Sequence, residues 1–465
     1  MERIYIKDLK EKIGEEIDIF GWINIRRDHG KLIFFDLRDT TGLVQVVALP
    51  NHEEAHKIAN DIRPEWVVRI KGKINERPER MCNEGLNGTL EIEALEIEVL
   101  NQSKTPPFEV NEDTSEVDEE VRLKYRYLDL RTERMHQNIK LRSDFVNRCR
   151  QYMFGYNFTE IETPLLTQAT PEGSRDFIVP SRLNPGKFYA LPQSPQQYKQ
   201  ILMNSGFDRY FQMARCLRDE DLRADRGFEH TQVDIEMSFV KQEDIMDMVE
   251  GMCITVMEDM GYKLRKPFER VTYSEAMEKY GADKFDIRTE EEKKEGIIAF
   301  AWVTDFPFFE KTEDDKWTFT HNPFSMPHED SLKDHMAGKN IEKIMACQYD
   351  LVCNGYECGG GSIRAHQPEV LEATYKNMGY SPEEIQESVG HIMDAFSYGA
   401  PPHGGIGIGV ERMMMILRNE EALREVQAFP TTRGGKTAVM NGPAELDEKT
   451  LKDLHIKVVE EGKKK

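Results

Sequence analysis

The stretch from Tyr210 to Phe239 constrains the fold of this chain more than any other segment. Its second half alternates polar with apolar side chains, and this period of two residues is typical of a β-strand with one face toward a core. Ordinary surface hairpins close with a short Asn-Gly or Asp-Gly turn, whereas a charged loop of roughly ten residues precedes this strand. The polar face of the predicted strand carries Gln232, Asp234, Glu236 and Ser238.

Arginines in and beside the loop suit a phosphorylated ligand. Arg218 and Glu220 stand at the end of the first predicted strand, and Arg223 and Arg226 lie within the loop. A guanidinium group donates paired hydrogen bonds to phosphate oxygens. The hairpin therefore indicates a phosphate site lying across a sheet. The same charges also fit a solvated ribbon of salt bridges, and the hairpin alone does not separate these interpretations.

The composition limits the class of protein. The 465 residues, 39% of them hydrophobic, suffice for two or three domains. A formal net charge of −22 excludes a generally basic coat for nucleic acid, so any RNA contact must use local basic patches. The chain shows neither a signal-peptide pattern nor an apolar run near the ~18 residues of a membrane helix, so we expect a cytoplasmic protein.

The cysteines point the same way. Seven cysteines, an odd number in a long acidic chain, indicate a reducing compartment. Cys347, Cys353 and Cys358 cluster in sequence, but their spacing without paired histidines is a poor zinc pattern. Buried free thiols are the better interpretation.

The first hundred residues predict a small β-barrel. A helical pattern at His52–Ile62 falls between the third and fourth of five strand patterns, which is the layout of an OB-fold. The predicted strands are Glu16–Arg26, Leu32–Arg38, Leu43–Leu49, Trp66–Lys73 and Leu90–Leu100.

One face of this barrel has side chains that suit single-stranded nucleic acid. We expect Arg26 and Arg27 to meet phosphates, Phe34 to stack on a base and Gln45 to read a base edge. Ordinary surface residues on a barrel would give the same strand pattern, so the pattern alone leaves both readings open.

A linker and a long helix follow. Residues 101–120 combine Pro106 and Pro107 with an acidic run, which predicts a stiff connection. We expect an amphipathic helix from about Met135 to Phe154, leading into a strand at Thr159–Leu165. Beyond it, Gln193–Gln200 begins a helix whose N-terminus favours an anion.

Two later segments add acidic and glycine-rich patterns. Asp350 and Glu357 flank a strand, and their oxygens suit magnesium held jointly with phosphates. Strand parity puts Glu357 and Arg364 on opposite faces, so a common site needs a bulge or break in the run of three glycines. In Pro401–Leu417 a glycine-alternating strand feeds a helix with Arg412 in its first turn.

These segments together resemble the class II aminoacyl-tRNA synthetases, specifically the aspartyl branch. The resemblance covers nearly the whole chain, and the tail AFPTTRGGKTAVM is similar to the bacterial subtype. The three class II motifs resemble GYNFTEIETPLL, RCLRDEDLRADRGFEHTQVDIE and GIGIGVERMMMIL, in this order. The aspartyl branch is further marked by TPEGSRDF, QSPQQYKQ and NGYECGGGSIRAH.

The resemblance implies an α+β chain with two domains. An OB-fold anticodon-binding domain would span residues 1–104 and a linker 105–131. A class II catalytic domain, an antiparallel sheet flanked by helices, would span 132–465 and pair with a second copy through the first motif. The large inserted domain of the bacterial subtype would be absent near residues 288–300.

The resemblance also implies the roles of individual residues. ATP would contact the proposed catalytic residues Arg218, Glu357 and Arg412 together with Glu220, Arg226, His230 and Gly409, and Mg²⁺ would bind Asp350 and Glu357. Aspartate would contact Glu172, Ser194, Gln196, Lys199, Gln232, Asp234, His321 and Arg364. The tRNA anticodon would contact Arg26, Arg27, His29, Phe34 and Gln45.

Several residues depart from the family pattern. His230 stands where Phe is usual, Asn322 replaces the second histidine of a common HHPF, and Glu411 replaces an Asp. His29 resembles enzymes that charge both tRNA(Asp) and tRNA(Asn).

The implied activity is an aspartate–tRNA ligase that consumes ATP. Two alternatives stay open on the sequence: a non-catalytic RNA-binding relative and an asparagine-specific ligase. Arg218, Glu357, Arg364 and Arg412 together argue against the first, and GGGSIR with QSPQQYK argues against the second.

Overall fold

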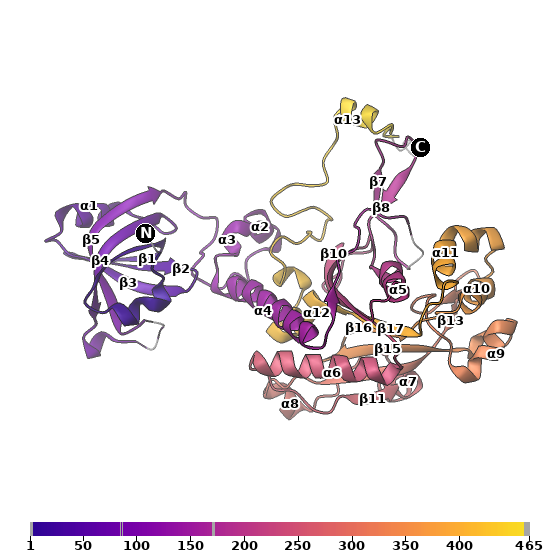
Figure 1. Cartoon of the computed structure of the whole chain (residues 1–465). Helices are drawn as coiled ribbons and strands as arrows, with labels where there is room; N and C mark the ends of the chain where they lie inside the picture. Colours follow the sequence, from indigo (N-terminus) through magenta and orange to yellow (C-terminus); the bar gives the residue numbers. More distant parts are fainter. Residues whose placement is uncertain (1–2, 84, 86, 170–172, 460–465) are drawn as a thin grey trace. The chain divides into compact units, whose positions relative to one another are not determined.

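A computed structural model describes residues 3–83, 85, 87–169 and 173–459 (Figure 1). The chain forms two compact units, residues 1–136 and 137–465. Among the described residues, none of the helices combines the length and apolarity that crossing a membrane requires.

The first unit contains a closed five-stranded barrel with strand order β1-β2-β3-β5-β4. Burial alternates along the strands, and Ile17, Ile19 and Ile23 of β1 point into the barrel. This is the predicted OB-fold, with the helix α1 (Glu53–Asp61) between the third and fourth strands. The strands are β1 (Glu16–His29), β2 (Leu32–Asp39), β3 (Gly42–Ala48), β4 (Val67–Glu76) and β5 (Leu90–Asn101), with the 3₁₀ turns η1 (Ile6–Lys12) and η2 (Glu79–Met81).

The segment after the barrel contains two short helices, α2 (Glu119–Lys124) and α3 (Arg126–Asp129). Asp118 caps α2, because its side chain accepts hydrogen bonds from the Glu120 and Val121 amides. The long helix α4 (Glu133–Gly155) follows, close to the predicted bounds. The boundaries of the predicted linker at 105–131 stay a prediction.

An eight-stranded sheet organises the second unit, in the order β11-β12-β15-β16-β17-β10-β9-β6. The pairs β11–β12 and β6–β9 are parallel and the other neighbours are antiparallel, which confirms the predicted α+β class. The strands are β6 (Thr159–Glu160), β9 (Arg209–Leu217), β10 (Glu229–Ser238), β11 (Glu269–Thr272), β12 (Phe300–Pro307), β15 (Met345–Cys353), β16 (Tyr356–Ile363) and β17 (His403–Gly409).

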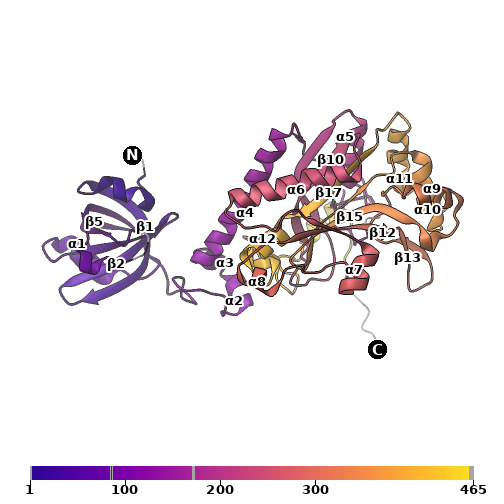
Figure 2. The ribbon, with the colours of Figure 1, turned by 90° about the horizontal axis from the view of Figure 1, so that it is seen from below.

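Helices cover one face of this sheet. α6 (Gln242–Asp259) runs along the sheet in both ribbon views, and its methionines share the main core with α4 and α12 (Val410–Arg418) (Figures 1 and 2). The remaining elements are α5 (Gln196–Asn204), α7 (Tyr273–Tyr280), α8 (Glu290–Lys294), α9 (Glu329–Ala337), α10 (Pro368–Asn377), α11 (Pro382–Phe396), α13 (Glu448–Asp453), β7 (Ile178–Pro180), β8 (Phe188–Ala190), β13 (Phe309–Lys311), β14 (Trp317–Phe319), η3 (Ile341–Lys343) and η4 (Leu423–Glu425).

Two local expectations need correction. The strand expected at Thr159–Leu165 pairs only over Thr159–Glu160, and Pro164 lies beyond the paired part. Arg218 and Glu220 belong to the connection after β9, which ends at Leu217, so they are not strand residues.

The glycines of β17 make room for the polar face of β10. Glu236 pairs with Gly405 and Asp234 with Gly407. A Cβ on Gly405 would stand 2.0 Å from the Ile235 carbonyl oxygen and 2.1 Å from Glu236 Oε2. A Cβ on Gly407 would stand 2.7 Å from Gln232 Oε1. The glycine alternation therefore lets buried polar side chains lie flat across the neighbouring strand.

Substituting Gly405→Ala tests this requirement. We expect a loss of about 1–3 kcal/mol or more in the free energy of unfolding, because the new methyl group meets backbone that cannot yield. Thermal melting should show a drop of several degrees. Gly434→Ala is the matched control, since its Cβ would meet only Thr432 Oγ1 at 3.9 Å; equal melting temperatures of both variants would contradict the prediction.

Candidate active site

A cavity of about 530 Å³ lies over the polar face of the central strands β10, β16 and β17. It brings together nearly all the site residues that the sequence predicts for the second unit. The predicted residues in its lining are Ser194, Gln196, Lys199, Arg218, Glu220, Arg226, His230, Gln232, Asp234, His321, Glu357, Arg364, Gly409 and Arg412.

Two predicted residues stand apart from this lining. Glu172 lies outside the described residues. Asp350 is buried below the cavity surface, where its Oδ2 is 3.7 Å from His321 Nδ1 and its Oδ1 accepts a hydrogen bond from Gln348 Nε2 at 2.7 Å.

Four buried charges form the inner end of the cavity. Lys199 Nζ lies 2.9 Å from Asp234 Oδ2 and 3.4 Å from Glu236 Oε2. Arg364 donates to both oxygens of Glu236, at 3.0 Å from Nε and 3.2 Å from Nη2. Arg364 Nη1 donates to Ser362 Oγ at 2.7 Å. Two cations and two anions therefore balance in a place where an unpaired charge would be costly.

The two carboxylates of this cluster differ in their electrostatics. Burial raises the pKa of Asp234 above its usual value, against the attraction of Lys199. Burial acts in the same sense on Glu236, but Arg364 and Lys199 outweigh it and lower the pKa. Asp234 Oδ1 is buried and has no hydrogen-bond partner among the described residues. A buried acceptor of this kind needs a donor, which a ligand in the cavity can supply.

Arginines gather at the outer end of the cavity. Arg412 Nη1 donates to the Glu357 carbonyl oxygen, and Arg412 Nη2 lies 3.6 Å from Asp225 Oδ2. Arg226 lies 3.8 Å from Glu220. The first turn of α12 is thereby joined to the loop after β9 and to β16, three segments far apart in the sequence.

His230 is neutral in this arginine-rich environment. Burial lowers its pKa to about 3, and the positive charges of Arg218, Arg412 and Arg215 contribute. A neutral imidazole presents a flat π surface without adding charge, so it can serve as a stacking surface for a base.

A β-bulge brings Glu357 to the cavity. Val352 pairs with Glu357 but its neighbour Leu351 pairs with Gly359, so Cys358 is an extra residue in β16. The extra residue shifts strand parity, and both Glu357 and Arg364 line the cavity. A bulge exists as parity requires, but its predicted place within the glycine run is wrong, because the extra residue is Cys358, which precedes Gly359.

The donor set at Asp350 and Glu357 fits a hard cation shared with phosphates. Burial raises the pKa of Asp350 to about 7, with His321 opposing and Glu357 adding to the rise. A divalent cation between two mutually repelling carboxylates would relieve this repulsion. Within the described parts of the chain, no group of three or more His, Cys, Asp or Glu side chains could hold a metal ion. Two carboxylates alone suit magnesium only if the phosphates and water complete its coordination.

Comparison with known proteins decides the family. Residues 118–433 match the tRNA synthetases of class II (D, K and N), and residues 17–100 match the OB-fold nucleic acid binding domain. The chain is 38% identical to the aspartate–tRNA(Asp/Asn) ligase of Trichodesmium erythraeum, over 97% of this chain and 98% of that one. It is 39% identical to the aspartate–tRNA ligase of Staphylococcus aureus, over 96% and 97% of the two chains. The chain belongs to the class II aspartyl-tRNA synthetases.

Solved structures share the fold of this family member. The structure of a putative aspartyl-tRNA synthetase from Leishmania major superposes with a TM-score of 0.75 at 21% identity, over 92% of this chain and 94% of that one. An asparaginyl-tRNA synthetase from Pyrococcus horikoshii gives 0.73 at 22% identity, over 92% and 98% of the two chains. Identities this low show the fold alone.

The chain is shorter than its aspartyl-tRNA synthetase relatives. Its alignment with the Trichodesmium enzyme runs over 587 positions, whereas this chain has 465 residues. The connection from α7 to β12 contains only the short helix α8. That the missing residues form the bacterial inserted domain near 288–300 stays a prediction.

Two departures from the family pattern have structural roles. Asn322 Oδ1 accepts hydrogen bonds from the Phe324 amide at 3.0 Å and from Ser325 Oγ at 3.2 Å, so Asn322 fixes the turn after His321. Glu411 is buried and accepts from the Thr231 amide at 2.8 Å and from Arg142 Nη2 at 3.0 Å.

Several residues that line the cavity have no role predicted from the sequence. Lys284, Thr320, Gln348 and Asp225 line the cavity without having been assigned a role in it. Lys284 Nζ lies 2.8 Å from Glu357 Oε2. Lys284 stands in a charged connection where nothing in the local pattern distinguishes it from a solvated lysine.

The structure places Arg27, Phe34 and Gln45 on one face of the barrel, as predicted, but not Arg26. That this face binds nucleic acid stays a prediction. Register places Arg27 opposite Phe34 and Gln45 opposite Asp36, on one face, and the His29 ring meets the Phe34 ring edge-on at 5.7 Å.

Arg26 pairs with the buried Phe35 and therefore points to the other side of β1. Its Nε donates to the Ala59 carbonyl oxygen at 3.0 Å, so it stabilises the position of α1. Arg27 itself forms a bidentate pair with Asp36 at 2.7 and 2.8 Å.

The lowered pKa of His230 predicts a pH dependence of stability. The unfolded chain takes up a proton near pH ~6.5, whereas the folded chain does so only near pH 3, so protonation favours unfolding between these values. The stabilisation by neutral His230 is fully present above pH ~6.5 and is lost as the pH falls toward 3.

We expect the melting temperature of His230→Phe to fall less on acidification than that of the wild-type protein. The difference between their melting temperatures should be constant above pH ~7 and should shift in favour of the variant between pH ~6 and ~4. A difference that is independent of pH over this range would contradict the assigned protonation state.

Proposed function

We propose that this chain is an aspartate–tRNA ligase that activates L-aspartate with ATP and transfers it to the 3′ end of tRNA(Asp). One observation carries the proposal: a balanced set of buried charges with an unsatisfied Asp234 oxygen adjoins a cluster of arginines in a single cavity. A small zwitterionic dicarboxylic acid fits the buried charges, and a nucleoside triphosphate fits the arginine cluster.

The amino acid is proposed to bind at the inner end of the cavity. Its α-ammonium group would donate to Asp234 Oδ1, the acceptor that has no partner among the described residues. Its side-chain carboxylate would be held by Lys199 and Arg364, whose positive charges reach the cavity. Asparagine cannot satisfy these cations in the same way, because its amide has no negative charge. The other proposed contacts are Glu172, Ser194, Gln196, Gln232 and His321.

ATP is proposed to bind at the outer end. The adenine would stack between His230 and Arg412, Glu220 would accept from the adenine amino group, and Gly409 would allow close approach of the backbone. Arg218 would lie at the α-phosphate and Arg226 at the distal phosphates. Magnesium, where bound by Asp350 and Glu357, would neutralise negative charge on the phosphates.

Catalysis then rests on positioning and on electrostatics. The α-carboxylate oxygen of aspartate attacks the α-phosphorus, the bond from that phosphorus to the β-phosphate bridging oxygen breaks, and pyrophosphate leaves with the electron pair. No protein nucleophile is required, because the substrates supply both the nucleophile and the leaving group. Arg218 and Arg412 stabilise the charge that develops at the α-phosphate.

The anticodon of tRNA is proposed to bind the barrel face formed by Arg27, His29, Phe34 and Gln45. Arg26 is excluded from this face by strand parity, and we assign it to the support of α1. His29 favours tRNA(Asn) as a second substrate, and the similarity to the aspartate–tRNA(Asp/Asn) ligase of Trichodesmium erythraeum supports this choice.

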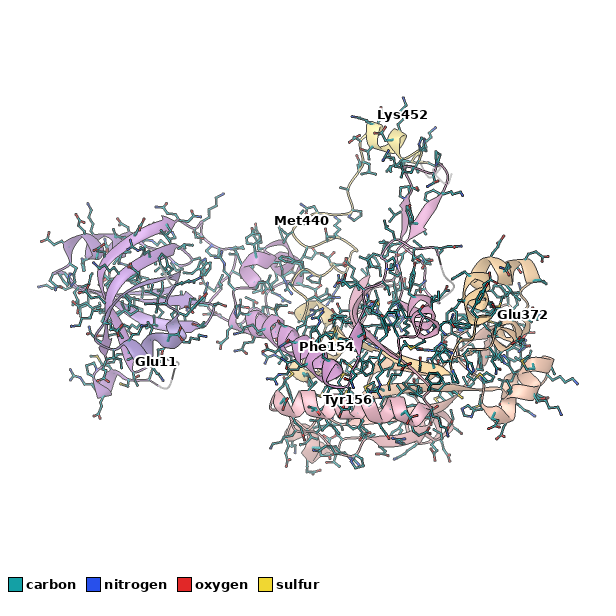
Figure 3. All side chains as sticks on the ribbon, in the orientation of Figure 1. Glu11, Phe154, Tyr156, Glu372, Met440 and Lys452 are labelled. Carbon is teal, nitrogen blue, oxygen red and sulfur yellow. The ribbon has the colours of Figure 1, made fainter. Side chains whose placement is uncertain are left out.

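We also propose a cytoplasmic homodimer that forms through the first class II motif. Large apolar side chains are exposed along the end of α4 and the segment after it, where 54% of Phe154 and 52% of Leu166 are accessible. Figure 3 shows Phe154 and Tyr156 at this end of α4. Exposed apolar surface of this kind is typical of an interface with another protein chain.

ATP–pyrophosphate exchange tests the activation step. We expect exchange that depends on L-aspartate and not on L-asparagine. Exchange with asparagine alone would favour an asparagine-specific ligase, and no exchange with either amino acid would favour a non-catalytic RNA-binding relative. Charging of purified tRNA(Asp) and tRNA(Asn) side by side then determines the range of tRNA substrates.

Asp234→Asn tests the amino-acid site. We expect kcat/KM for aspartate in the exchange reaction to fall about a hundredfold or more, while the affinity for ATP changes less than about threefold. Asp129→Asn is the matched control, because Asp129 is also buried and pairs with Arg126, but in the first unit. Arg364→Ala is less informative, since it would leave Glu236 buried without its main partner.

A further inference from the structure

Lys284 is a cation at the cavity that the proposed mechanism does not use. It lies in the connection between α7 and α8, and its side chain is 41% exposed. Its ammonium nitrogen lies 2.8 Å from Glu357 Oε2. Among the described residues, Lys199 and Lys284 are the two lysines in the cavity lining. Lys199 is held in the buried cluster, whereas Lys284 stands at the end where Arg412 contacts Glu357.

The backbone around Lys284 is firmly held. Phe285 is buried in a small core and stacks on Tyr280 with the ring centroids 4.1 Å apart. Asp286 accepts from Arg288 through both carboxylate oxygens, at 2.9 and 2.8 Å. Since the residues on its C-terminal side are fixed by packing and by an ion pair, Lys284 has a defined place at the cavity.

The partner of Lys284 has another proposed task. Glu357 is a proposed magnesium ligand, and a carboxylate that coordinates a metal ion offers less charge to a lysine. The side chain of Lys284 is 41% exposed, so its ammonium group lies beside this carboxylate and is still accessible to a ligand. A lysine on a flexible stem can move its charge by a few ångströms to a nearby phosphate.

We propose that Lys284 binds the β- and γ-phosphates of ATP and the pyrophosphate that leaves. This inference rests on the proposed function and adds a residue to it. Lys284 pairs with Glu357 in the structure. With ATP bound, its ammonium group meets the phosphates on the far side of the bond that breaks. There it stabilises the negative charge that pyrophosphate gains when the electron pair moves to the bridging oxygen.

Lys293 offers a matched control. It lies in the same segment of the chain, its side chain is 40% exposed, and its Nζ lies 2.8 Å from Glu290 Oε1. The two lysines thus share exposure and ion-pair distance, but Lys293 does not line the cavity. Any effect of losing a surface charge or an ion pair as such should appear equally in Lys284→Met and Lys293→Met.

Binding measured by calorimetry, without an amino acid, tests the inference apart from activity. We expect Lys284→Met to weaken binding of ATP and of inorganic pyrophosphate by about tenfold or more, while AMP binding changes less than about twofold. Lys284→Arg should recover part of the loss, and Lys293→Met should match the wild-type protein. Melting temperatures of all variants check that they are folded.

Three results would overturn the inference. Unchanged or tighter ATP binding by Lys284→Met would show that the lysine only neutralises Glu357. An equal loss for AMP and ATP would show general damage to the site, and a similar loss in Lys293→Met would show a nonspecific charge effect. If the wild-type protein binds ATP but exchanges pyrophosphate with neither amino acid, the proposed function fails while the binding comparison still decides the role of Lys284.

Discussion

The buried pairing of Lys199 and Arg364 with Asp234 and Glu236 is the interaction on which the site depends. Removing four charges from water is expensive, and the cost is offset only when every charge has a partner. Here each cation meets a carboxylate at 2.9 to 3.0 Å. The cluster joins α5, β10 and the end of β16. The ion pairs that offset the cost of burying these charges therefore also fix the geometry of the cavity.

A second set of contacts assembles the outer end from distant segments. Arg412, in the first turn of α12, reaches both the backbone of β16 and the loop after β9. Glu411, one residue earlier, connects α12 to β10 and to α4. The adjacent side chains of Glu411 and Arg412 therefore connect the loop after β9, the sheet and the helix α4. This explains why an arginine cluster forms although its members are almost two hundred residues apart.

Periodicity predicted much of this arrangement, and tertiary contacts decided the rest. The alternation in β10 and the glycines of β17 both follow from strand parity, and the structure pairs them with each other. Parity required a bulge, but the predicted position within the glycine run was wrong by one residue. The extra residue is Cys358, because the position of the bulge depends on how β15 and β16 pair. Nothing in the sequence around Lys284 predicted its ion pair with Glu357. Arg26 is different: two consecutive residues of a strand cannot share a face, so the sequence already contained the reason against it.

Gly405 and Gly407 of β17, the strand beside β10, limit how the amino-acid preference of this fold can change over evolution. Side chains cannot be added at Gly405 or Gly407 without displacing the residues above them. A new preference must therefore arise at the opposite wall or at strand ends, through α5, β10 itself or the residue that follows β16. The two glycine positions are closed to adaptation, and descendants of such a protein would diverge at the other positions around the cavity.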